Sequence, residues 1–410
     1  MPDLSRRPAN PFRVLLTHAN FRRFWIGQTL SLIGTWMQSM AIGWLALELS
    51  NNAFIVGLVA ASSALPILLF SLFAGVVVDR TDKLRIVRLA QALLLIEAAL
   101  LWYFTWRGHM NIPGLIALAT LGGMITSFEI PARQSLMIDL VGRDDLRDAI
   151  ALNSSGFNLA RIFGPAIAAA IIARWGIAWC FAVNAASYLT VLVGLALIKL
   201  PAHSPVVAAE SPWEGMRAGI RFVTTDRRLR GLVETISVFA ILCTPTLALM
   251  PVMARDQLHL GAGGYGVLLS AVGIGGLVGA LALAASSARL RRGPLLVRSQ
   301  YVLAGLILLL SLSRSAAMAY PLLLATGCVL IVNSALGNTM MQAIVPDAYR
   351  GRLMAIYSLI VVGLPQVVGA FAAGGIARMV GISWTLAITA VLMLLYGWWA
   401  FHRYPEIRTL

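Results

Sequence analysis

The chain has 410 residues, of which 59% are hydrophobic and only 12% are charged, with a mean hydropathy of +0.82. Soluble globular domains are about 45–50% apolar and about 25% charged, so this composition indicates an integral membrane protein rather than a soluble protein with a large core. The formal charge of +15 would suggest nucleic acid in a soluble protein, but in a membrane protein basic residues also collect in cytoplasmic loops. The three cysteines lie far apart in apolar segments, and their spacing suggests neither a disulfide framework nor a metal site.

Twelve segments are long and apolar enough to cross a bilayer as helices, each of which needs about 20 mostly apolar residues. In chain order they cover residues 22–48, 53–78, 85–106, 112–138, 148–173, 177–200, 229–255, 262–288, 295–313, 318–343, 351–377 and 381–402. We therefore predict an all-α membrane protein. The basic N-terminal segment lacks a compact apolar core followed by a cleavage site, so we expect a retained first helix.

The longest connection between spans is polar and contains proline. Its segment SPWEGMRAGIRFV places Trp213, Met216, Ile220 and Val223 on one side of a helix, which predicts an amphipathic helix along the membrane surface. We expect three parts, namely an N-terminal six-helix bundle (1–200), a cytoplasmic linker with this helix (201–228) and a C-terminal six-helix bundle (229–410).

The basic residues fix the orientation of the spans. With the N-terminus inside, 26 of the 32 Lys and Arg residues fall on the cytoplasmic side. The outside loops hold only Arg107, Arg174, Arg255, Arg314 and Arg378. Short cytoplasmic loops collect Lys and Arg, so this bias predicts that both termini are cytoplasmic.

An internal repeat supports the division into halves. IIARWGIAW (171–179) recurs as GIARMVGISW (375–384), and DLVGRDDLRDAIAL (139–152) parallels AIVPDAYRGRLMAIY (343–357), both at an offset of about 205 residues. Helices rich in Ala and Gly resemble one another in any case, but the matched Ala-Arg, Gly-Ile and Trp positions favour a duplication. Six-span halves related by an axis along the membrane normal are the architecture of major facilitator transporters.

The stretch GVVVDRTDKLR, between the second and third spans, resembles the signature loop of the major facilitator superfamily, G-x-x-x-D-R-x-G-R-K/R. Gly75, Asp79, Arg80 and Lys83 match, whereas Asp82 stands in place of the loop glycine. We expect the first glycine to let two helices pack closely near the membrane face.

The resemblance implies two contacts for this loop. Asp79 would cap the positive end of the eleventh span near Arg350 and Arg352, and Arg80 would bind Asp139 near the end of the fourth span. An anion at a helix N-terminus is favourable by about 0.3–1 kcal/mol, which biases a gate without locking it. Ordinary topological charge with a capping Asp is the alternative.

GFNLARIFGPAIAAA, in the fifth span, resembles the Gly-Pro motif of antiporter-type facilitators at Gly156, Gly164 and Pro165. Small residues let this span pack tightly on its partner, and the proline frees a backbone carbonyl. The resemblance implies export, although such packing occurs in any helix bundle. Two blocks, 129–165 and 345–359, further resemble the bacterial efflux branch that includes enterobactin exporters.

Charged residues inside the predicted spans are functional candidates because a charge in hydrocarbon is costly. We expect Glu129 to pair with Arg161, either as a structural brace or as a pair that a proton on Glu129 opens for an anionic substrate. Glu97, near mid-depth, is expected either to exchange protons or to be a passive polar group. Glu234, one turn into its span, is expected to snorkel to the interface.

Uncharged polar residues are expected to line a central cavity. The main candidates are Gln28, Gln38, Asn158 and Asn333, and further ones are Thr35, Asn153 and Asn338. Aromatic and Met side chains could add an adaptable apolar lining. These are Trp36, Met37, Met40, Trp44, Met340 and Met341. Helix packing or lipid contact is the alternative for each of them.

The sequence favours a monomeric, proton-coupled exporter of small amphipathic, drug-like or siderophore-like molecules in the bacterial cytoplasmic membrane, working by alternating access. Uptake or lipid flipping on the same scaffold, or a non-transporting assembly factor, are the alternatives. Paired His ligands, a P-loop and a Ser/His/Asp set are all missing from the sequence, so we expect no enzyme, no cofactor and no metal. Nucleic-acid binding is not expected, because the bases are spread over loops on one membrane face.

Overall fold

The computed structural model describes residues 12–198, 212–285, 292–345 and 363–409, together with 357 and 359. These residues are almost entirely helical and include no strand. Arg350, Arg352 and the start of the eleventh span lie outside the described residues, as does the side chain of Asp79.

The first half begins with a short helix, α1 (Phe12–Thr17), which packs on the first long helix. The six long helices are α2 (Ala19–Ser50), α3 (Ala53–Asp79), α4 (Lys83–Trp106), α5 (Ile112–Val141), α6 (Leu146–Trp175) and α7 (Ala178–Ala196). Their ends agree with the first six predicted spans to within four residues.

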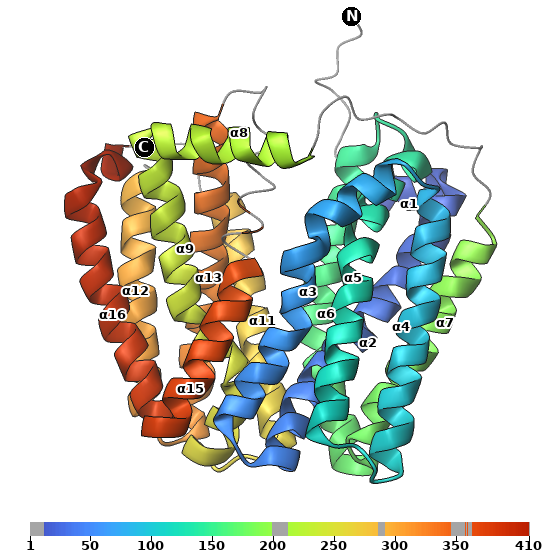
Figure 1. Ribbon diagram of the computed structural model, residues 1–410, viewed down its shortest axis with the longest axis horizontal. Helices are drawn as coiled ribbons and strands as arrows, with labels where there is room; N and C mark the ends of the chain where they lie inside the picture. The colour runs from blue at the N-terminus through green and yellow to red at the C-terminus, as the bar shows by residue number, and fades with distance from the viewer. Residues whose placement is uncertain are drawn as a thin grey trace, which may run out of the picture.

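The second half is preceded by α8 (Pro212–Thr225) and contains two π-helical turns. Its elements are α9 (Arg227–Ala248), α10 (Met250–Val252), the π turn Met253–Gln257, α11 (Ala262–Ala285), α12 (Arg292–Leu312), α13 (Ala316–Ile344), the π turn Pro365–Gly369, α15 (Ala370–Val380), α16 (Ile382–Arg403) and the 3₁₀ turn Pro405–Thr409. Ten helices of the described chain are long and apolar enough to cross a membrane. α4 and α15 are not among the ten but lie alongside them (Figure 1). α4 corresponds to the third predicted span and α15 to the end of the eleventh, whose start lies outside the described residues.

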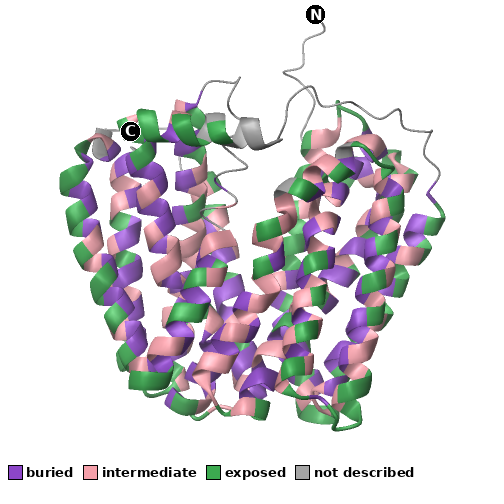
Figure 2. Ribbon diagram, viewed as in Figure 1, coloured by how far each residue is buried: buried purple, intermediate pink, exposed green. Residues whose placement is uncertain are grey.

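The long helices form two groups, α2–α7 on one side and α9–α16 on the other (Figure 1). α8, from the predicted linker, lies across the end of the bundle at which α1 and the end of α16 are found. Buried residues face the interior of each group, while exposed residues cover its outside (Figure 2). Large apolar side chains such as Leu89, Val193, Leu281 and Leu395 are about 60% exposed, which suits a surface in contact with lipid.

Several helices begin at a side chain that caps their free N–H groups. Asp82 accepts hydrogen bonds from the backbone N–H groups of Leu84 and Arg85 and so caps α4. Asp226 caps α9 in the same way. Asn52 and Asn111 cap α3 and α5 at the opposite end of the bundle. Such caps satisfy donors that have no partner within the helix.

The two halves pack against each other at the end opposite α8. The rings of Phe54 on α3 and Phe371 on α15 lie 5.3 Å apart, and those of Trp44 on α2 and Tyr265 on α11 lie 5.9 Å apart. Gly57 on α3 lies directly against the backbone of α15 at Ala370. This end of the seam between the halves is therefore closed in the structure.

Candidate transport site

The signature loop lies where α3 ends and α4 begins. Lys83 Nζ donates to Asp139 Oδ2 at 3.0 Å, so the partner of Asp139 is Lys83, and the expected Arg80 pairing is wrong. Arg80 directly follows the last turn of α3 and is exposed, whereas Lys83 opens α4, which packs along α5. A Cβ added to Gly75 would meet no described atom within 4 Å, and the start of the eleventh span lies outside the described residues, so the close packing at Gly75 stays a prediction.

The Gly-Pro motif holds α6 close to α2. A Cβ added to Gly156 would lie 2.8 Å from Thr29 Oγ1, and one added to Gly164 would lie 2.6 Å from Trp36 Cβ. Both distances are too short for a real side chain, so only glycine permits this approach. The motif glycines therefore set how deeply α6 packs on the first long helix.

The other side of α6 faces α11, across the seam. Pro165 has no N–H, so the carbonyl oxygen of Arg161 loses its helical donor. This carbonyl lies beside Gly273 of α11, where an added Cβ would come within 3.1 Å of it. Ser270 Oγ donates to the carbonyl oxygen of Ile162 at 3.0 Å. α6 therefore joins the two halves through backbone contacts.

Glycines also line the face of α11 that packs on α13, within the second half. Gly275 lies against the carbonyl oxygen of Leu324, and Gly279 against that of Cys328. A Cβ at either position would collide with these carbonyl oxygens. α11 is thus held closely on two sides, by α6 of one half and α13 of the other.

The side chain of Arg161 projects from α6 toward the second half. Its Nη2 donates to Asn158 Oδ1 at 3.3 Å and also lies against Gly276 of α11, where an added Cβ would collide with it. Ile331 of α13 lies beside the same glycine. The guanidinium thus stands at the seam, in contact with α11 and close to α13.

The expected pair between Glu129 and Arg161 is wrong. Glu129 Oε1 instead accepts from Arg133 Nε at 2.8 Å, one turn along α5, and from Gln91 Nε2 of α4 at 3.3 Å. Glu129 is 5% exposed. It is thus paired within the first half, and no carboxylate of the described residues lies within ion-pair distance of Arg161.

Glu97 lies in a separate polar network among α2, α4 and α7. Gln38 Nε2 donates to both carboxylate oxygens of Glu97, at 2.9 and 3.2 Å, and Gln38 Oε1 accepts from Asn184 Nδ2 at 2.8 Å. Glu97 is 1% exposed and Asn184 is fully buried. Sequence reasoning missed Asn184, although a lone Asn in an apolar span is the kind of signal that could have found it.

The remaining candidates lie apart from Arg161 in local contacts. Gln28 is buried on α2, and Asn333 Nδ2 donates to Ser299 Oγ at 3.0 Å inside the second half. Glu234 is partly exposed, accepts a hydrogen bond from the hydroxyl of Tyr404 at 2.8 Å and lies 3.9 Å from Arg230 Nε, and its snorkelling stays a prediction. Of the predicted polar residues, the structure therefore joins only Asn158 to Arg161 by a hydrogen bond.

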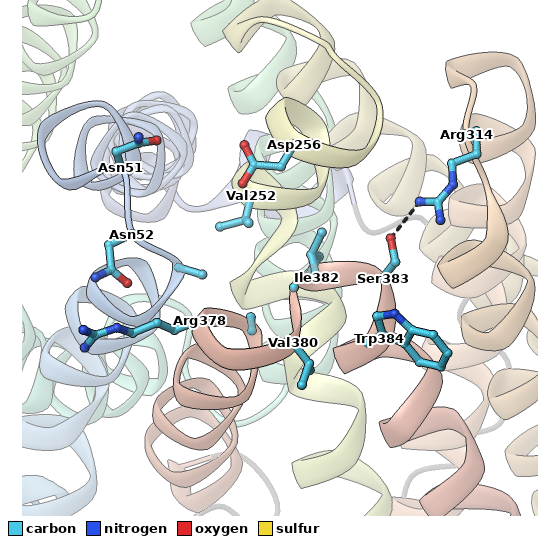
Figure 3. Close-up of a pocket in the computed structure, with 13 residues that line it drawn as sticks. Asn51, Asn52, Val252, Asp256, Arg314, Arg378, Val380, Ile382, Ser383 and Trp384 are labelled. Atoms are coloured by element: carbon cyan, nitrogen blue, oxygen red, sulfur yellow. Dashed lines mark hydrogen bonds between the residues drawn. The ribbon is translucent and has the colours of Figure 1, made fainter.

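The closed end of the seam carries a pocket of about 520 Å³ (Figure 3). Asn51, Asn52 and Ala53 line it from the first half, and the other lining residues come from the second. Arg314 Nη1 donates to Ser383 Oγ at 2.8 Å on one side of the pocket. No group of three or more metal-ligating side chains was found in the described part of the chain.

Two groups of apolar helices that meet along a seam are the architecture of major facilitator transporters. The chain belongs to the transmembrane secretion effector family of this superfamily, whose model matches residues 9–407.

Curated relatives include siderophore transporters. The chain is 26% identical over 393 residues to the enterobactin exporter EntS of Shigella flexneri, covering 93% of this chain and 92% of the relative. It is 27% identical over 266 residues to the staphyloferrin A transporter of Staphylococcus aureus, covering 63% of this chain and 66% of that transporter.

Solved structures share the fold at low sequence identity. The nucleoside transporter NupG matches with a TM-score of 0.78 at 11% identity, covering 94% of this chain and 99% of NupG. A bacterial homolog of the human lysosomal transporter Spinster, in an inward-facing and occupied conformation, matches with a TM-score of 0.75 at 13% identity, covering 98% of each chain.

Proposed function

We propose that the protein is a proton-coupled exporter of small, amphipathic, siderophore-like molecules that works by alternating access. It would act as a monomer in the bacterial cytoplasmic membrane, with both termini in the cytoplasm. The observation that carries the proposal is the seam, where small residues of α11 contact the backbone carbonyl oxygens of α6. Two siderophore transporters among the relatives support the substrate class and, through the enterobactin exporter, the direction of transport.

The contacts between the halves support alternating access. We propose that residues 1–200 and 229–410 move as two units joined by the linker 201–228. The ring pairs Phe54–Phe371 and Trp44–Tyr265 meet at one end of the seam only, where they would part when the protein opens outward. Small residues along α6 and α11 would let the two surfaces pivot without interlocking side chains.

A crosslink across the closed end tests this motion. Cysteines at Phe54 and Phe371, in a chain whose Cys180, Cys243 and Cys328 are replaced by alanine, should form a disulfide that stops transport until a reductant is added. Each single cysteine variant is the control and should transport under oxidising conditions. Full transport with the disulfide formed would contradict alternating access at this seam.

Glu97 is the best candidate for the proton-coupling residue. Among the described residues, Glu97 accepts hydrogen bonds only from the side-chain amide of Gln38. The other buried carboxylate, Glu129, is neutralised by Arg133. A carboxyl without a cationic partner can gain and lose a proton without breaking an ion pair. Gln38 would transmit the change to α2, which packs on the Gly-Pro motif of α6.

Everted membrane vesicles test the function as a whole. Vesicles that carry the protein should accumulate enterobactin or staphyloferrin A when a proton gradient is imposed, and should lose this activity when an uncoupler collapses the gradient. Vesicles without the protein are the control. Accumulation that persists with the uncoupler would exclude proton coupling, and accumulation in right-side-out vesicles instead would indicate uptake.

A further inference from the structure

We infer that Arg161 binds an anionic group of the substrate, so that the protein selects amphipathic molecules that carry a carboxylate or another oxyanion. The inference rests on the proposed function, because it assigns the substrate class of that transport site. It concerns binding at equilibrium and can therefore be tested without transport.

Arg161 lies at the middle of the bundle. It is the sixteenth of the thirty residues of α6, roughly 21–23 Å along the helix axis from the two ends at about 1.5 Å per residue. The residue as a whole is only partly buried in this conformation. A cation at this depth is costly unless it has a partner or serves a function.

The partners of Arg161 do not neutralise its charge. Among the described residues, its one hydrogen bond runs to the amide oxygen of Asn158 at 3.3 Å, and its Nε is buried without a hydrogen-bond partner. Two other basic side chains of the first half have more partners, although Arg88 Nε is likewise buried without a hydrogen bond. Arg133 pairs with Glu129, and Arg88 Nη2 donates to the carbonyl oxygens of Leu195 and Ile198.

An unmatched guanidinium has a specific chemical preference. It presents planar N–H donors in a fork that fits the two oxygens of a carboxylate, and such charged hydrogen bonds are about twice as strong as neutral ones. An anion bound here would supply the charge that the described residues do not. A neutral molecule of the same shape would leave the guanidinium unpaired.

The position of Arg161 also links the anion to the movement of the halves. The guanidinium comes from α6 in the first half and occupies the space beside Gly276 in the second. Because any side chain at Gly276 would collide with Arg161, this glycine keeps the guanidinium at the seam. An anion bound to Arg161 would contact both halves of the protein. It would be released when the two halves move apart at the seam.

Binding of a matched pair of probes tests the inference. The probes are 11-(dansylamino)undecanoate and its neutral carboxamide, titrated by fluorescence into purified protein in nanodiscs of zwitterionic lipid. Wild-type protein should bind the carboxylate at least roughly tenfold more tightly than the amide, as expected for a charged rather than a neutral hydrogen-bonded partner. R161Q should abolish this preference, and R161K should keep part of it because the charge remains.

Two controls separate binding from folding. Arg174, exposed in the last turn of the same helix, gives the control R174Q, which should keep the preference. G276A should weaken carboxylate binding by displacing the guanidinium, whereas G305A should not, because a Cβ at Gly305 meets nothing within 4 Å. R161K and G276A keep the charge, so they test geometry even if R161Q folds poorly.

The outcomes distinguish this inference from the proposed function. Equal binding of both probes by wild-type protein, no binding of either probe, or an unchanged preference in R161Q would overturn the inference, even if vesicles export siderophores. Selective carboxylate binding that depends on Arg161 would support it, even if the vesicle assay shows that the direction or the coupling ion is different.

Discussion

The buried charges inside the first half and the arginine at the seam differ in how their hydrogen bonds are completed. Glu129 is held by Arg133 and Gln91, and Glu97 by Gln38, so each carboxylate has its donors within its own half. Arg161 points out of its half and, among the described residues, has only the amide oxygen of Asn158 as a hydrogen-bond partner. Matched groups tie helices of one unit together, whereas an unmatched group at a boundary is available to a ligand.

The strongest test of this comparison is the stability of R133Q against that of R161Q. R133Q leaves Glu129 buried without its cation and should lower the free energy of unfolding by about 3 kcal/mol, near the lower end for a broken buried pair. R161Q removes a charge that has no carboxylate partner and should be neutral or stabilising. Thermal unfolding of the purified variants in detergent measures both effects.

The double variant E129Q/R133Q gives the matched control and should recover most of the stability, because it leaves no unpaired charge. If R161Q instead loses as much stability as R133Q, the seam arginine is a structural brace. The distinction between the two regions would then fail.

E97Q should separate proton coupling from binding, with a smaller effect on stability. The amide has one carbonyl oxygen where the carboxylate has two, so Gln38 loses one acceptor and the variant should be less stable by about 1 kcal/mol. Transport driven by a pH gradient should be lost, while exchange of labelled for unlabelled substrate continues. Gradient-driven transport by E97Q at the wild-type rate would show that Glu97 is a passive part of the network.

Effects on stability of about 1 kcal/mol or less are expected at the signature loop. D82A removes the cap of α4 and should cost about 1 kcal/mol of stability, whereas D82G should cost only a few tenths. D79N should leave stability unchanged but slow transport, if Asp79 holds the start of the eleventh span in the outward-open state. Unfolding assays on the three variants measure the changes in stability, and vesicle assays measure the transport rate of D79N. A D79N protein that transports at the wild-type rate would exclude a gating role for Asp79.

The positions of the helices could be predicted from the sequence because length and apolarity alone determine them. The first six spans agree with α2–α7 to within four residues. Asp82 does not fit the family pattern, but its role as the N-cap of α4 can be recognised from the sequence, since an Asp just before a helix is a common cap.

The partners of the buried charges could be predicted only in part. Glu129 and Arg133 are four residues apart, and this spacing alone favours a pair on one helix face. The expected pair with Arg161 was wrong because adjacency of two helices does not determine how each is rotated about its axis. The approach of Arg161 to Gly276 depends on tertiary packing between the halves, which neither local spacing nor composition encodes.

The glycines of α11 have a consequence for engineering the substrate range. Gly275 and Gly279 pack on α13, while Gly273 and Gly276 face α6, so these two sides of the helix admit no new side chain without a collision. Mutant libraries that diversify Gly275 and Gly279, where a Cβ would meet backbone carbonyl oxygens, should therefore yield mostly inactive proteins. New specificities are better sought on α6 around Asn158 and on α13 around Ile331, where side chains already reach the seam.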